Sequence, residues 1–140
     1  ENSGPNVTNM YLSGPYVSGA SYDAFLDKWS TKFGGVPPSG FHAFAYDGTN
    51  LLLDAIEKVA VVDSDGSVHI GRQALRDAIT GVTDYTGLTG KLDCSDNDYS
   101  AFGINNASHG DCATGEALGI FQITQAELDG NWPPEAVYTP

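Results

Sequence analysis

The stretch GFHAFAYDGTNLLLDAI, residues 40–56, carries most of the information about the fold. It opens with aromatic residues, passes through Tyr46-Asp47-Gly48 and then becomes almost wholly apolar. From about residue 46 to residue 60 the pattern predicts a helix that is apolar nearly all round, with Asp54 and Lys58 as one i,i+4 pair. A helix with so narrow a polar face is expected to be covered by neighbouring elements on most of its sides.

A second helix is predicted upstream of this stretch, from Ser21 to Phe33. Its aromatic residues recur at intervals of three and four, so they share one face, and we expect Trp29 and Phe33 to be buried there. Ser21 is the expected N-cap, and Gly34-Gly35 ends the helix. Further upstream, residues 7–12 are typical of a short strand, and Gly14-Pro15 indicates a loop.

Downstream of the opening stretch the expected elements are short. A turn at residues 63–66 precedes a helix over residues 72–80, and residues 87–93 indicate a turn with a short strand. A polar loop then leads to an apolar, β-rich run at residues 118–124 and a turn at residues 127–132. The chain is therefore expected to be α/β, with too few strands for a self-sufficient sheet.

The charge of the chain excludes one class of partner. Six basic residues stand against 18 acidic ones, and no basic residue follows Lys91. A surface of this kind repels phosphate, so we expect no binding to nucleic acid. There is no apolar run of about 18 residues, and the N-terminal ENSGPNVTN lacks the charged and apolar segments of a signal peptide, so neither a membrane span nor a signal peptide is expected.

The two cysteines, Cys94 and Cys112, favour a disulfide over a pair of reduced thiols. Their spacing fits no zinc pattern, and they lie in a region rich in Gly, Asn, Asp and Ser. A disulfide across this loop would stabilise the fold by about 3 kcal/mol in the chain-entropy model. It would also imply an oxidising compartment outside the cytoplasm.

Catalytic and metal sites find little support in the sequence. His42, His69 and His109 are scattered, none with a partner at metal or triad spacing, and each is expected to be structural or exposed. No nucleophile elbow or phosphate-binding glycine loop occurs, so a small hydrolase has no candidate residues. Closely spaced carboxylates at residues 93–98, and fewer at residues 63–66, leave open an alternative: a secreted interaction module with acidic loops ordered by calcium.

Several of these segments, taken in order, resemble one family. The helix YDAFLDKWSTKFGG is followed by Pro37-Pro38, FAYDGTNLLLDAI, IGRQALRDAI, the hairpin GLTGKLDCSDND and finally GIFQIT with DGNW. This order is similar to the C-terminal part of a type I periplasmic solute-binding protein, closest to the receptors of ABC importers for branched-chain amino acids and amides. The chain departs from the family at Gly48, Cys94 and Asn97, and its 98–116 loop is longer.

The resemblance implies a partial type I periplasmic-binding-protein fold, in which helices pack on short strands of an incomplete sheet. Because family members are more than twice as long and have two lobes, the chain is expected to be their C-terminal portion. Residues from about 20 to 90 would form a returning segment of the first lobe, and residues from about 115 to 140 a terminal piece of the second. The chain is then expected to pair with a missing N-terminal portion or with itself.

The resemblance also implies a function and a set of site residues. The expected function is capture of a small polar solute, an amino acid or a related amide or carboxylate, by cleft closure for the membrane permease of an ABC importer. No enzymatic activity and no cofactor are expected, and the location is periplasmic or extracellular, by secretion or a lipid anchor. Phe41 corresponds to an aromatic that lines the ligand cleft, with a core aromatic as the alternative. Tyr46, Tyr16 and Tyr11 are further cleft candidates, and Tyr46 and Asp47 are expected to anchor the helix start, Asp47 through capping or the helix dipole.

Overall fold

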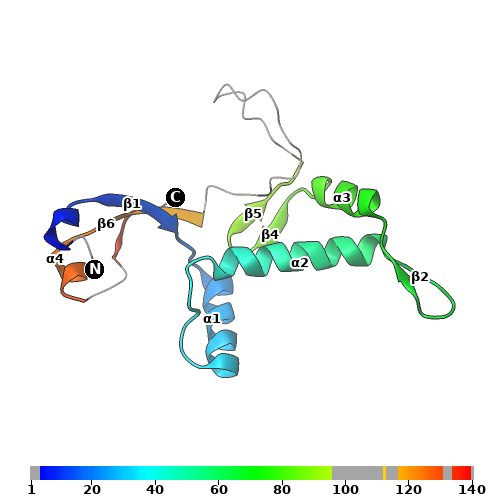
Figure 1. Cartoon of the computed structure of the whole chain (residues 1–140), viewed down its shortest axis with the longest axis horizontal. Coiled ribbons are helices and arrows are strands. Elements are labelled where there is room, and N and C mark those ends of the chain that lie inside the picture. The colour runs from blue at the N-terminus through cyan, green and yellow to red at the C-terminus, as the bar shows by residue number, and fades with distance from the viewer. Residues whose placement is uncertain (1–3, 96–111, 113–116, 131–133, 140) are drawn as a thin grey trace, which may run out of the picture. The chain divides into compact units, whose positions relative to one another are not determined.

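The computed structural model describes residues 4–95, 112, 117–130 and 134–139. It divides into two compact units, which are described separately (Figure 1). The first comprises Glu1–His42 and Gly115–Pro140, and the second comprises Ala43–Thr114. The mixture of helices with small, incomplete sheets is consistent with the partial α/β fold expected from the sequence.

The first unit contains a three-stranded antiparallel sheet. Its strands are β1 (Tyr11–Pro15), β6 (Leu118–Gln122) and β7 (Ala136–Tyr138), with β6 in the centre. The prediction of a β-rich run near residues 118–124 is confirmed, but β1 begins later than predicted and includes Gly14-Pro15, which we expected in a loop. Because β1 is an edge strand, the missing N–H of its proline costs no ladder hydrogen bond in the centre of the sheet.

Two short helical elements accompany this sheet. The 3-10 helix η1 (Gly4–Val7) precedes β1, and α4 (Gln125–Leu128) stands where we expected a turn to begin. Thr124 and Glu127 form a capping box around the start of α4: the Thr124 hydroxyl and N–H both donate to the Glu127 carboxylate, at 2.7 Å each. These hydrogen bonds lower the pKa of Glu127, and the one from the Thr124 side chain contributes most. The cap explains why so short a segment is helical.

Helix α1 (Ala20–Phe33) has no buried residue. It starts after Gly19, whose φ is 109°, and no side chain caps it, so the prediction of a Ser21 cap is wrong. It ends as predicted at Gly34, where a φ of 76° favours glycine. The expected burial of Trp29 and Phe33 is also wrong: Phe33 is 61% exposed and Trp29 is half-buried, with described ring contacts to Phe25 and Phe33 of the same helix.

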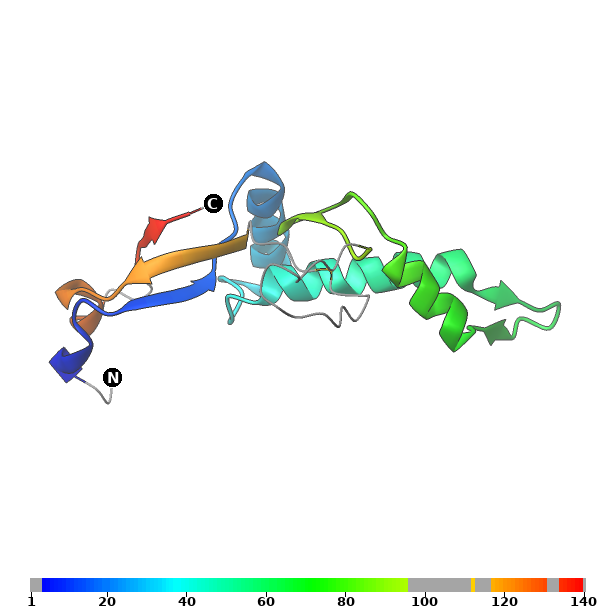
Figure 2. The ribbon, with the colours of Figure 1, turned by 90° about the horizontal axis from the view of Figure 1, so that it is seen from above.

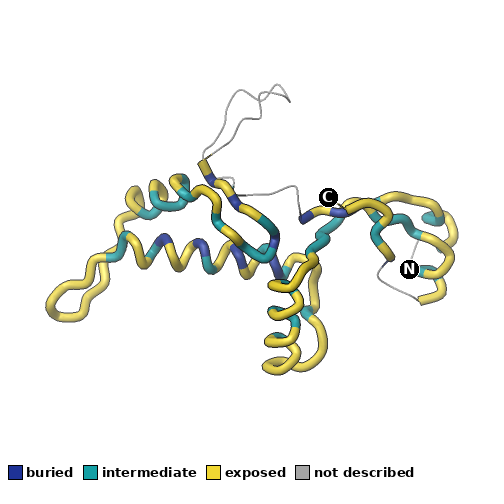
Figure 3. Tube along the Cα trace, turned by 180° about the vertical axis from the view of Figure 1, so that it is seen from behind, coloured by how far each residue is buried: buried dark blue, intermediate teal, exposed yellow. Residues whose placement is uncertain are grey.

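The second unit is built on helix α2 (His42–Val59), which starts four residues before the predicted residue 46. Its buried residues are Ala43, Asp47, Leu51 and Ala55, and their spacing of four places them on one stripe (Figure 3). Leu52 and Leu53, on the other side, are 40% and 55% exposed. The described chain thus covers one face of α2, not most of its sides as we expected.

Two hairpins and a helix complete this unit (Figure 2). The first hairpin joins β2 (Val61–Val62) to β3 (Val68–His69), and all residues from 61 to 70 are exposed. Helix α3 (Arg72–Thr80) has the predicted bounds. The second hairpin joins β4 (Tyr85–Gly87) to β5 (Gly90–Leu92) and packs on α2 through a polar contact described below.

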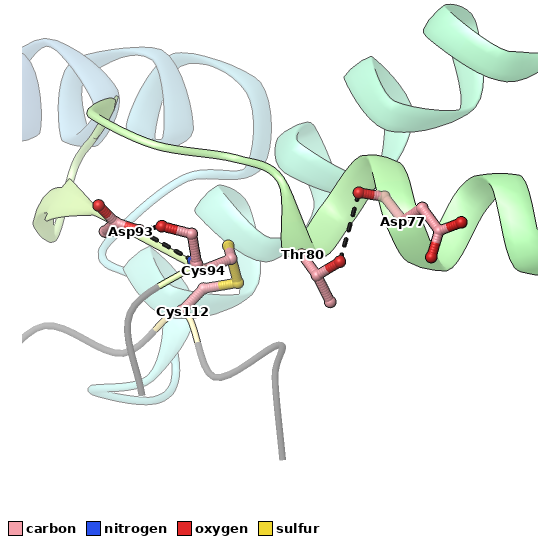
Figure 4. Close-up of a disulfide and its surroundings, with 6 residues drawn as sticks. Asp77, Thr80, Asp93, Cys94 and Cys112 are labelled. Atoms are coloured by element: carbon pink, nitrogen blue, oxygen red, sulfur yellow. Dashed lines mark hydrogen bonds between the residues drawn. A yellow bond between two sulfur atoms is a disulfide. The ribbon is translucent and has the colours of Figure 1, made fainter. Parts of the chain in front are cut away.

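The main hydrophobic cluster is small. Leu51 of α2, Leu92 of β5 and Cys94 form its buried centre, and Ile79, Val82, Tyr85 and Cys112 pack around them. Cys94 and Cys112 are joined in the expected disulfide (Figure 4). Of the helices in the described part of the chain, none has the length and apolar character needed to cross a membrane.

Candidate functional site

Phe41 lies directly before α2 and is an exposed residue, with 63% of its surface accessible. Ser39 holds the turn that carries it. The Phe41 N–H donates to Ser39 Oγ at 3.2 Å, and the His42 N–H donates to the Ser39 carbonyl at 3.4 Å. The result is a large aromatic side chain that is exposed in the described chain and lies on a locally restrained backbone.

Tyr16 lies on a segment that adjoins the Phe41 turn. It follows β1 and donates its N–H to the Ala117 carbonyl at 2.8 Å. A Cβ atom built on Gly40 would lie 3.5 Å from Pro15 Cγ, so the residues immediately before Tyr16 and Phe41 are in van der Waals reach. Two of the four predicted cleft residues therefore come from neighbouring segments of the first unit.

The other two candidates lie elsewhere. Tyr11 stands at the far end of β1, opposite Gln122 and about 13 Å along the strand from Pro15. Tyr46 belongs to the second unit, is 45% exposed, and is near enough to Tyr85 to help raise the pKa of that phenol. The structure thus supplies no reason to group Tyr11 with Tyr16, or Tyr46 with Phe41.

Asp47 has a role that the sequence did not predict. Its side chain is buried, with the residue 3% exposed, and it lies in the second turn of α2, not at its start. Its carboxylate accepts hydrogen bonds from the Leu88 N–H at 2.8 Å, the Thr89 N–H at 2.8 Å and the Thr89 hydroxyl at 2.7 Å. The expectation that Asp47 caps the helix or contacts its dipole is therefore wrong. Asp47 attaches α2 to the turn of the β4–β5 hairpin.

Glycine at position 87 permits this attachment. A Cβ atom there would lie 2.4 Å from Asp47 Oδ2 and 2.6 Å from its Cγ, a separation that side chains do not show. Two sequence features could have revealed the contact: Asp47 shares the spacing of Ala43 and Leu51, and the hairpin contains Gly87-Leu88-Thr89-Gly90. A lone carboxylate on the buried stripe of a helix requires donors, and a glycine-flanked turn offers its N–H groups.

A groove of about 260 Å³ in the second unit is lined by α2, by Ala78 of α3 and by residues between 81 and 85. Buried Leu51 and Ala55 lie along it, and Asp54, Lys58 and Tyr85 add polar groups. Burial, and next the nearby Asp54 carboxylate, raise the pKa of the Tyr85 phenol. The Tyr85 phenol and the Asp54 carboxylate therefore lie close together at this groove.

The calcium-ordered alternative gains no supporting observation. Asp93 accepts hydrogen bonds from the Ser95 N–H at 2.8 Å and the Ser95 hydroxyl at 2.6 Å, while residues 96–98 of the same loop lie outside the described residues. Asp65 likewise accepts from the Ser67 N–H at 2.9 Å. Within the described ranges, no three His, Cys, Asp or Glu side chains are grouped as metal ligands.

The histidines differ in their surroundings. His69 is exposed and lies 3.0 Å from an Asp63 carboxylate oxygen. His42 is half-buried against α1 and has both ring nitrogens in hydrogen bonds. His109 lies outside the described residues.

A family model described as "Periplasmic binding protein" matches residues 1–103, which is about three quarters of the 140 residues. The matched region includes the Phe41 turn, helix α2 and the hairpin that Asp47 holds. No curated protein matches the chain significantly. The comparison with solved structures likewise found no significant match.

Proposed function

This chain belongs to the type I periplasmic binding proteins, in the family of the branched-chain amino acid receptors, and from that premise we propose its specific role. The family has a general role in solute binding for ABC transport outside the cytoplasm and is generally not enzymatic. The disulfide is consistent with that location. The role we propose is capture of an amino acid or a related amide or carboxylate by closure of a cleft, with no covalent chemistry.

The exposure of Phe41 is the observation that carries this proposal. A large aromatic residue that is 63% exposed costs solvation free energy unless a ligand or another part of the protein covers it. The Ser39 turn restrains its backbone, and Tyr16 on the adjoining segment adds a second aromatic. Aromatic walls of this kind are typical of small-ligand clefts, where a few polar groups then fix orientation.

We further propose that the chain is the C-terminal portion of a two-lobed receptor, with residues from about 20 to 90 in the first lobe and from about 115 to 140 in the second. The exposed Leu52 and Leu53 of α2 and the open edges of the β1–β6–β7 sheet support the view that the chain is part of a larger receptor. The remaining part of the receptor, or a second copy of the chain, would cover these surfaces. The complete receptor would be secreted or lipid-anchored and would deliver its solute to the membrane permease.

The test compares two phenylalanines of nearly equal exposure. Phe41→Ala and Phe33→Ala each remove a ring that is more than 60% accessible, but only Phe41 lies on the proposed cleft wall. Calorimetry against a panel of amino acids and amides would use the chain alone and the chain joined to the sequence encoded upstream of Glu1. We expect Phe41→Ala to weaken binding by about tenfold, roughly 1.4 kcal/mol, and Phe33→Ala to leave it unchanged.

The chain alone is expected to bind no panel member more tightly than about 1 mM, because one wall cannot enclose a small ligand. A monomeric chain that binds one amino acid at micromolar affinity would contradict the two-lobe assignment. Equal losses in the two phenylalanine variants would contradict the assignment of Phe41 to the cleft.

A further inference from the structure

His42, the first residue of α2, is enclosed by the aromatic face of α1. Its ring stacks on Tyr22, with centroids 5.6 Å apart and planes 19° apart, and on Phe25, at 5.7 Å and 9°. His42 is half-buried in this contact and follows the exposed Phe41 directly. The position of the Phe41 turn thus depends on how the imidazole is held.

Hydrogen bonds at both ring nitrogens indicate which tautomer the neutral His42 ring adopts. Nδ1 contacts the Ser39 carbonyl, which can only accept, so Nδ1 must carry a proton. In the neutral ring Nε2 is then an acceptor, and the Tyr22 hydroxyl donates to it at 2.8 Å. When the ring is neutral, the geometry therefore favours the Nδ1–H tautomer.

Protonation of the imidazole conflicts with this arrangement. A second proton turns Nε2 into a donor, so the Tyr22 hydroxyl must reverse its orientation and give up its acceptor. The added positive charge also lies at the N-terminus of α2, where the helix dipole disfavours a cation. Acid is therefore expected to weaken the contact between α1 and the turn before α2.

We propose that His42, held by Tyr22, is a positioning residue for Phe41 and that protonation of its imidazole loosens the turn that presents the Phe41 ring. The significance of this for solute binding rests on the proposed function; the positioning itself does not. The device would make the aromatic wall respond to the acidity of an extracytoplasmic compartment.

Among the described residues, the ionisable neighbours of the imidazole that can be named belong to α1 and α2. From α1 the phenol of Tyr22 contacts it, and Asp23 follows Tyr22 in the chain; burial, and next Asp23, raise the pKa of Tyr22. From α2 the nearest ionisable residues in sequence are Tyr46 and Asp47, one turn further on. Residues 34–41 contain none.

The test places 4-fluorophenylalanine at position 41 of the full chain and follows its fluorine resonance and the imidazole nitrogen resonances as pH falls. We expect a neutral Nδ1–H tautomer of His42 and a fluorine shift with the same midpoint as the His42 titration. In His42→Gln the amide oxygen can still accept from Tyr22 but cannot titrate, so the fluorine shift should be lost while the neutral-pH position is kept. His69→Gln, at an exposed histidine, is the matched control and should retain the full shift.

A second variant tests the proposal even if His42→Gln does not fold correctly. Tyr22→Phe removes only the hydroxyl that His42 contacts. At neutral pH, the fluorine resonance of this variant should have the chemical shift that the unmodified chain shows at acidic pH. No solute enters these measurements, so their failure is distinct from failure of the proposed function. A fluorine resonance that ignores the His42 titration, a response that persists in His42→Gln, or an unchanged Tyr22→Phe spectrum would each overturn the proposal.

Discussion

Helices α1 and α2 have equally clear apolar patterns in the sequence, but only α2 buries residues in the structure. The aromatic residues of α1 pack mainly on one another: Trp29 lies 6.1 Å from Phe25 and 4.6 Å from Phe33 between ring centroids. On α2 a buried carboxylate attaches the helix to a hairpin more than 40 residues further along the chain. Periodicity thus identifies residues that share a face, but burial requires a partner element with complementary polar groups.

Among the variants that test this comparison, the one that removes the Asp47 carboxylate should lower the free energy of unfolding most. Asp47→Ala leaves the buried Thr89 N–H and hydroxyl and the part-buried Leu88 N–H without their acceptor, and we expect a loss of about 3–5 kcal/mol in the free energy of unfolding. Urea unfolding followed by circular dichroism would measure it. Glu57→Ala, at an exposed position of the same helix, should cost less than about 0.5 kcal/mol, and equal losses would mean that Asp47 does not attach the hairpin.

Loss of the disulfide should cause the second-largest decrease in the free energy of unfolding. Replacing Cys94 and Cys112 by alanine frees the loop in the unfolded chain, and we expect a loss of about 3 kcal/mol. The same loss should appear when a reductant is added to the unmodified chain, and the reductant should have no further effect on the double variant. Thiol titration of the unreduced, denatured chain should find no free thiol; two titratable thiols would contradict the disulfide.

Two glycines near Asp47 should respond to alanine with opposite signs. Gly87→Ala places a Cβ atom against the carboxylate and should cost about 1–3 kcal/mol. Gly48→Ala, on α2 with no atom within 4 Å of the added methyl, should stabilise the chain by about 0.5–1 kcal/mol. Thermal unfolding of the two variants side by side tests the pair. If Gly87→Ala left the stability unchanged, the hairpin would have to lie further from α2 than in this structure.

The aromatic face of α1 should give the smallest loss. Trp29 is half-buried and loses two ring contacts in Trp29→Ala, so we expect about 1–2 kcal/mol rather than the 3–5 kcal/mol of a buried tryptophan. Lys28→Ala, exposed one residue earlier, is the control for the helix itself. A loss as large as that of Asp47→Ala would show that another surface covers α1 in solution.

Local patterns in the sequence predicted much of the secondary structure. The bounds of α3, the end of α1 at Gly34 and the β-rich run of β6 follow from glycine placement and side-chain spacing, which act over a few residues. The family was also predictable, because several moderately specific motifs occur in the right order, and the family match confirms it.

Contacts between distant residues were not predictable in the same way. Asp47 was assigned to its own helix because the sequence does not show which turn approaches it 41 residues later. The partnership of Tyr22 with His42 was missed for the same reason, since neither residue has an informative neighbour in sequence. The cleft role of Phe41 and Tyr16 stays a prediction, as do those of Tyr11 and Tyr46, because a ligand contact depends on atoms that local spacing does not describe.

The position of the disulfide has a kinetic consequence. Cys94 is wholly buried in the main hydrophobic cluster, whereas Cys112 is half-buried. A thiolate reagent that attacks Cys94 must wait for the cluster to open, and one that attacks Cys112 must expel the Cys94 thiolate into apolar surroundings, where a charged leaving group is disfavoured. Both routes are slow for the same physical reason. The rate at which a small thiol reduces this disulfide should therefore report how strongly the cluster shields the Cys94 sulfur.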